Sequence, residues 1–87
     1  YPAMNVCYGN DPFAAISTSP EVLATLRLHL RTIEQSADTL QVHLASERAQ
    51  GFVEALEVLK VLKPAELESL YLIMDDAAQA RVTALLL

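Results

Sequence analysis

The longest regular pattern in the chain is a stripe of apolar residues between Ser19 and Leu44, which recur at alternating steps of three and four. This spacing places the side chains on one face of an α-helix, in a stripe as narrow as a coiled-coil seam. Ser19 suits the N-cap, Pro20 suits the first turn because it lacks an N–H, and Glu21 complements the helix dipole. The pattern predicts a helix that begins at Pro20 and has one stripe: Leu23, Leu26, Leu30, Ile33, Ala37, Leu40 and Leu44.

The stripe loses its phase after Leu44, where a second stripe begins. The change of phase, the candidate cap Ser46 and the nearby Gly51 favour a turn around residues 45–47 and therefore a helical hairpin. A single bent helix from Pro20 to Leu62 is the alternative, because a glycine inside a helix costs only about 1 kcal/mol. The second stripe consists of Ala49, Phe52, Val53, Leu56, Leu59 and Leu62.

A third helix is predicted from Pro64 onward. The residue before a proline is pushed out of the α region, so Lys63 ends the preceding helix and Pro64 starts the next. Leu72 and Ile73 lie outside the inner stripe, so this helix is apolar over much of its circumference. The inner stripe consists of Leu67, Leu70, Tyr71, Met74, Ala78, Val82 and Leu85.

The first part of the chain has no sustained period. We predict an extended N-terminal arm over residues 1–18, followed by a helical domain over residues 19–87. Asp11 before Pro12 can start a single turn. Phe13 and Ile16 then either close one end of the core or dock on another chain. The predicted fold is all-α, with a helical hairpin and a third helix forming a small three-helix bundle.

The composition of the chain predicts that the bundle associates with a second subunit. In a chain of 87 residues, 53% are hydrophobic, and the single cysteine, Cys7, excludes an internal disulfide. A domain this small buries about 60% of its unfolded surface, and the apolar surplus is typical of a subunit interface. We therefore expect a homodimer through the first stripe, at Leu23, Leu26, Leu30, Ile33, Leu40 and Leu44. The apolar residues left over are candidates for binding a different protein: Phe13, Ile16, Leu28, Val42, Leu72 and Ile73.

The charge and hydropathy of the chain limit the kinds of molecule that it is expected to bind. The net charge is −5, with 6 Lys and Arg against 11 Asp and Glu, which argues against direct binding to nucleic acid. No apolar run approaches the roughly 20 residues of a membrane span. A lone cysteine favours the reducing cytoplasm.

No group of residues predicts catalysis, a metal or a cofactor. His29 and His43 would lie about 21 Å apart along one helix, too far to share a metal. Cys7 has no neighbour that would activate its thiol. Asp75 and Asp76 point about 100° apart on a helix and do not converge. We expect a non-enzymatic protein without cofactors.

Two resemblances suggest a class of function. A short group near the start of the third helix resembles part of the Hha-type nucleoid modulators, which are small helical proteins that act with a DNA-binding partner. That group consists of Leu62, Glu66, Leu67, Leu70, Tyr71 and Asp75.

The whole chain is similar in its order of elements to the QslA-type quorum-sensing anti-activators of pseudomonads. The similar segments are the N-terminal NVCYGNDPFAAISTSPEVL, the leucine-rich helix after it and the C-terminal ESLYLIMDDAAQARVTALLL. This resemblance implies a helical homodimer that binds the LuxR-type transcription factor LasR and prevents its dimerisation. The expected function is sequestration of a protein partner, with an Hha-like modulator or a purely structural dimerisation module as alternatives.

Overall fold

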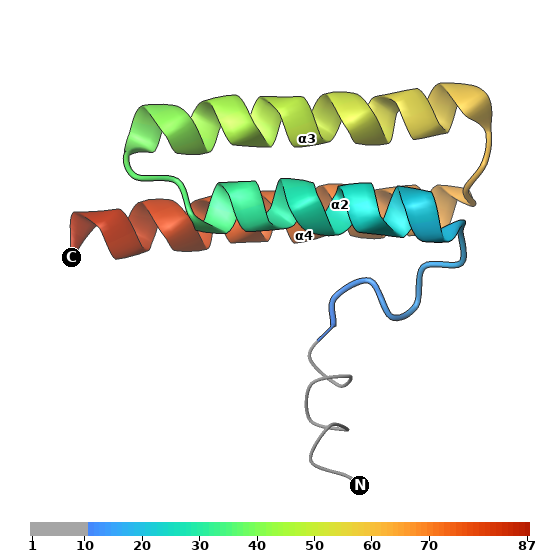
Figure 1. Ribbon diagram of the computed structural model, residues 1–87, viewed down its shortest axis with the longest axis horizontal. Helices are drawn as coiled ribbons and strands as arrows, with labels where there is room; N and C mark the ends of the chain where they lie inside the picture. The colour runs from blue at the N-terminus through green and yellow to red at the C-terminus, as the bar shows by residue number, and fades with distance from the viewer. Residues whose placement is uncertain (1–10) are drawn as a thin grey trace, which may run out of the picture.

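Three helices make up the computed structural model, which describes residues 11–87. They are α2 (Pro20–Glu34), α3 (Thr39–Leu59) and α4 (Pro64–Leu86). Each helix contacts the other two, and α3 runs in the direction opposite to α2 and α4 (Figure 1). The described residues contain no strand. The predicted all-α three-helix bundle is confirmed.

The start of α2 agrees with the sequence prediction. The Ser19 side chain accepts a hydrogen bond of 3.2 Å from the Val22 N–H, and Pro20 occupies the first turn. The hydroxyl and the proline together leave fewer backbone N–H groups without a partner at this end. Local chemistry therefore fixes the beginning of the helix.

The first helix ends much earlier than predicted. α2 stops at Glu34, and the chain turns over residues 35–38 before α3 begins at Thr39. Asp38 caps α3 by accepting a hydrogen bond of 2.8 Å from the Gln41 N–H, while the Gln41 side chain accepts one of 2.9 Å from the Ala37 N–H. The predicted helical hairpin is present, but its turn at 45–47 is wrong, and so is the single bent helix from Pro20 to Leu62, because this reciprocal cap starts a new helix at Thr39.

The turn between α2 and α3 is also tied to the third helix. The Arg81 Nε–H donates a hydrogen bond of 2.8 Å to the Ser36 carbonyl oxygen. Ser36 itself is buried, and its hydroxyl donates to the Thr32 carbonyl at 2.9 Å. Since a buried backbone carbonyl needs a donor, Arg81 stabilises the turn in this position.

The second turn begins earlier than predicted, because α3 does not continue to Leu62 and Lys63. α3 ends at Leu59, and Lys60 adopts the left-handed conformation, with φ 57° and ψ 38°. Pro64 then begins α4 as predicted. The Glu66 carboxylate accepts hydrogen bonds from two backbone N–H groups, Lys63 at 3.0 Å and Ser17 at 2.9 Å, and so joins the start of α4 to the segment before α2.

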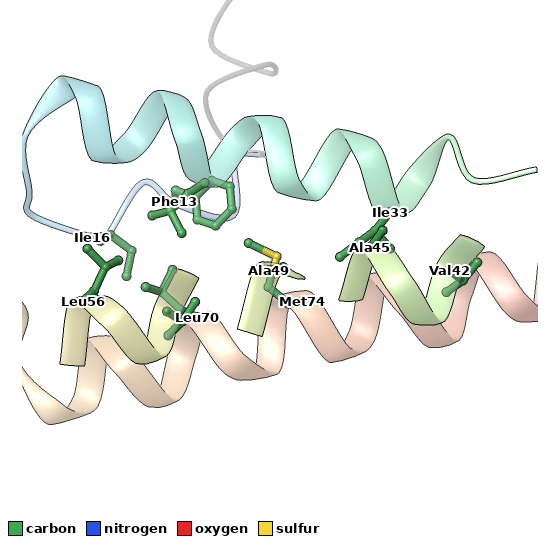
Figure 2. Close-up of a cluster of buried hydrophobic side chains, with 11 residues drawn as sticks. Phe13, Ile16, Ile33, Val42, Ala45, Ala49, Leu56, Leu70 and Met74 are labelled. Carbon is green, nitrogen blue, oxygen red and sulfur yellow. The ribbon is translucent and has the colours of Figure 1, made fainter. Parts of the chain in front are cut away.

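The core contains residues from all three helices and from the segment before them. Phe13 and Ile16 are buried in it, so residues 11–18 of the predicted arm pack onto the bundle, while residues 1–10 lie outside the described part (Figure 2). Asp11 starts the predicted single turn by accepting a hydrogen bond of 3.0 Å from the Phe13 N–H. The buried apolar residues are Phe13, Ile16, Leu26, Ile33, Val42, Ala45, Ala49, Val53, Leu56, Leu70 and Met74.

Candidate protein-docking surfaces

The two histidines of the chain lie in different surroundings. The His29 ring lies against the Phe52 ring, with centroids 5.4 Å apart. Burial lowers the pKa of His29, and the positive charge of Arg48 contributes to the same shift. His43 is exposed on α3. Over residues 11–87, no three His, Cys, Asp or Glu side chains gather as metal ligands, and Cys7 lies outside this range.

The acidic residues near α4 also bond within the fold. Asp75 accepts a hydrogen bond of 2.8 Å from the Gln79 side chain, one helical turn further on. The pKa of Glu66 is held below its ordinary value mainly by the Ser17 N–H and then by the Lys63 N–H. Both carboxylates therefore form hydrogen bonds that belong to α4 or to its start.

The predicted dimer stripe is divided between two helices. Leu26 and Ile33 of α2 are buried in the core of the bundle, and Leu23 and Leu30 are partly buried against that core. Leu40 and Leu44 belong to α3 and are exposed. The predicted interface is therefore wrong as one continuous surface, because the turn at 35–38 separates its two halves and the bundle itself covers the first half.

The predicted partner-binding set is divided in the same way. Phe13, Ile16 and Val42 are buried among the helices, so their assignment to a partner surface is wrong. Ile73 is partly buried. Leu28 and Leu72 are each 57% exposed, but they lie on different helices. Of the predicted set, these two leucines present the most surface to a partner.

A concave, mainly apolar groove lies at the turn between α3 and α4. Its volume is about 640 Å³, within the range typical of binding sites. Val58 and Leu59 at the end of α3 and Val61 in the turn are also exposed. The residues that line it are Glu57, Lys60, Leu62, Pro64, Leu67, Glu68, Tyr71 and Leu72.

Of the residues that line this groove, the sequence prediction assigned only Leu72 to a partner-binding surface. The missed signal is the apolar character of the turn itself, since Val61 and Leu62 follow Val58 and Leu59 across Lys60. Turns are usually polar, because a small folded protein rarely leaves several neighbouring apolar residues exposed. An apolar turn is therefore a sequence indication of a binding surface.

Leu72 also borders a second, smaller hollow. That hollow has a volume of about 500 Å³ and is lined from the N-terminal segment by Pro12, Ala15 and Ile16. Ile73 lies in it as well. The exposed Leu72 therefore separates two concave surfaces on the same end of the bundle.

The outer face of α3 is the second exposed apolar surface. Leu40 and Val58 are 67% and 73% exposed, and Leu44 is also exposed. At 100° per residue these side chains point away from the buried Ala49. Gly51 lies on the same face, where an added Cβ would meet no atom within 4 Å. A helix with apolar residues on two opposite sides is typical of contact with a second neighbour.

No protein-family model, curated protein sequence or solved structure matches the chain. Among the residues that the structure describes, no helix combines the length and the apolar character needed to cross a bilayer.

Proposed function

We propose that this protein is a non-enzymatic regulator that binds and sequesters a protein partner. The observation that carries the proposal is the groove of about 640 Å³ at the α3–α4 turn, with Leu62, Leu67, Tyr71 and Leu72 in its lining. Apolar grooves of this kind accept the apolar face of a partner helix. A few buried anchors would supply most of the affinity.

The partner class that we propose is a LuxR-type transcriptional activator. It is the class that the resemblance to QslA-type anti-activators suggests, and such an activator must dimerise before it binds DNA. A helix held in the groove would be unavailable for the activator's own assembly. In this proposal the protein acts in the cytoplasm as a negative regulator of quorum sensing.

The proposal is tested by mixing the protein with a purified LuxR-type activator and measuring DNA binding by fluorescence anisotropy. We expect the wild type to release the activator from its operator and Leu72→Ser to lose at least tenfold in potency. Leu28→Ser is the matched control, because Leu28 is equally exposed but lies on α2, away from the groove. Both substitutions remove an exposed leucine, so stability should change little in either.

A further variant separates the two hollows that Leu72 borders. Ala15→Arg fills the smaller hollow and leaves the groove unchanged, since Ala15 lines only the smaller hollow of these two. It should retain full potency. Equal potency of Leu72→Ser and wild type would contradict docking in the groove.

Self-association through the outer face of α3 is a second candidate function, because Leu40 and Val58 lie near its two ends at equal distances from the middle of the helix. Leu40 and Val58 are equally far from Ala49, the central residue, and so are Glu47 and Gly51. Two antiparallel copies of α3 would therefore pair Leu40 with Val58 and place Glu47 over the space at Gly51. Such self-complementarity is what a two-fold interface requires.

This dimer should be weak. α3 has 21 residues and is about 31 Å long, so one helix face offers less than the roughly 800 Å² per subunit of a stable interface. In sedimentation, Leu44→Asp should shift the population to monomer, whereas Leu28→Asp should not. The two leucines are 56% and 57% exposed, which makes the comparison matched. A dimer that persists in Leu44→Asp would exclude this face.

A further inference from the structure

The groove at the α3–α4 turn has acidic edges around an apolar lining. Glu57 lines it from α3 and Glu68 lines it from α4, and both residues are exposed. Glu54 contributes from one turn further back, since its negative charge acts on the Tyr71 hydroxyl. The pKa of Tyr71 is raised by burial first and then by the negative charges of Glu57 and Glu54.

Positive charge at the groove is confined to the α3–α4 turn. Lys60 lines the groove, whereas Lys63 lies between the lining residues Leu62 and Pro64 without lining it. Over residues 11–87 the only ion pair joins Arg27 to Asp11, so none of the three carboxylates near the groove is neutralised by an ion pair. The helical walls of the groove are therefore negative, and its floor is apolar.

We propose that the groove binds a cationic amphipathic helix of a protein partner, with aliphatic side chains on the floor and Lys or Arg beside the two acidic walls. The inference rests on the proposed function and specifies the partner's chemistry. An acidic helix of the same apolar pattern would place its carboxylates beside Glu57 and Glu68. Complementary charge selects between such partners more strongly than it adds affinity.

The test uses two synthetic helical peptides with the same leucine stripe, one flanked by lysines and the other by glutamates. Binding to the full chain is measured by fluorescence anisotropy at low salt and at high salt. We expect the lysine peptide to bind about tenfold more tightly at low salt and to lose most of this preference at high salt, as exposed ion pairs do. Leu72→Ser should weaken both peptides.

A charge-reversal pair assigns the preference to the groove. Glu57→Lys with Glu68→Lys should reverse the preference toward the glutamate peptide. The control, Glu21→Lys with Glu34→Lys, changes the net charge equally and should retain the preference. Glu21 and Glu68 both lie near helix starts, Glu34 and Glu57 lie near helix ends, and all four are exposed, so the two variants perturb the helices similarly.

The outcomes separate this inference from the proposed function. Equal binding of the two peptides, or the same reversal in the control, would overturn the cationic preference but leave docking in the groove intact. Binding that Leu72→Ser does not weaken, or no binding of either peptide, would overturn docking in the groove itself.

Discussion

At the scale of single residues, two positions hold an amino acid that makes the fold less stable than another residue type would. Lys60 ends α3 in the left-handed conformation, with φ 57°, where glycine is the preferred residue. Gly51 lies inside α3 on its exposed face, where alanine is preferred. Lys60 lines the groove and Gly51 lies on the outer face of α3, so both departures occur on proposed binding surfaces.

Lys60→Gly should raise the free energy of unfolding by about 1 kcal/mol, because glycine adopts a positive φ without a Cβ clash. Urea denaturation followed by circular dichroism measures the change. Lys60→Ala is the control: it removes the same side chain but keeps the backbone strain, and so should give no comparable gain. An equal gain in both variants would assign the effect to the lysine charge.

Gly51→Ala should also stabilise the monomer by about 1 kcal/mol, since a methyl group at this position meets no atom within 4 Å. The reverse change one turn further on, Ala55→Gly, should cost a similar amount. If α3 pairs with a second copy across Gly51, the alanine variant will also dimerise more weakly. Thermal melts at low and high protein concentration distinguish these two effects.

At the scale of elements, the start of α4 depends on one carboxylate. Glu66 accepts hydrogen bonds from Ser17 and Lys63, which hold its pKa below the ordinary value of 4.5. As pH falls, the unfolded chain therefore binds this proton before the folded chain does. The stabilising contribution is complete above about pH 4.5 and is lost as pH falls through the folded-state pKa.

The wild type should accordingly lose stability as pH falls below about 4.5, and Glu66→Ala should show a shallower loss. Melting temperatures measured across this range test the prediction. Asp11 contributes to the remaining slope, because the hydrogen bond from Arg27 lowers its pKa in the same direction. Identical slopes for wild type and Glu66→Ala would show that the cap is unimportant for folding.

The turn between α2 and α3 shows why an apolar pattern can mislead. Residues 35–38 are close in number to one helical turn, so Leu40 and Leu44 stay in phase with Leu30 and Ile33 although the chain reverses direction. The useful signal was local: Asp38 followed three residues later by Gln41 is a capping pair. The apolar spacing concealed this turn, because the spacing stays the same whether the chain continues as one helix or reverses direction.

At the scale of the whole molecule, the segment before α2 completes the core. Phe13 is 1% exposed, and it lies with Ile16 in the same buried cluster as Leu56, Leu70 and Met74. A bundle of three short helices buries limited apolar surface, so each large core residue represents an appreciable part of its stability. The segment is part of the folding unit.

Phe13→Ala should therefore destabilise the fold by about 3–5 kcal/mol, comparable to the whole stability of a small domain. Differential scanning calorimetry or urea denaturation would detect this loss. Leu28→Ala, at a site that is 57% exposed, should change stability by less than about 0.5 kcal/mol. An unchanged melting temperature in Phe13→Ala would restore the alternative that this ring binds another chain.

The sequence by itself determined the features that depend on neighbouring residues. Ser19 with Pro20 fixed the start of α2, and Lys63 with Pro64 fixed the start of α4, because caps and prolines act within one helical turn. Tertiary structure decided which apolar residues remain exposed. Whether Phe13, Val42 and Leu72 are buried depends on what lies opposite them, and that depends on where the chain turns back.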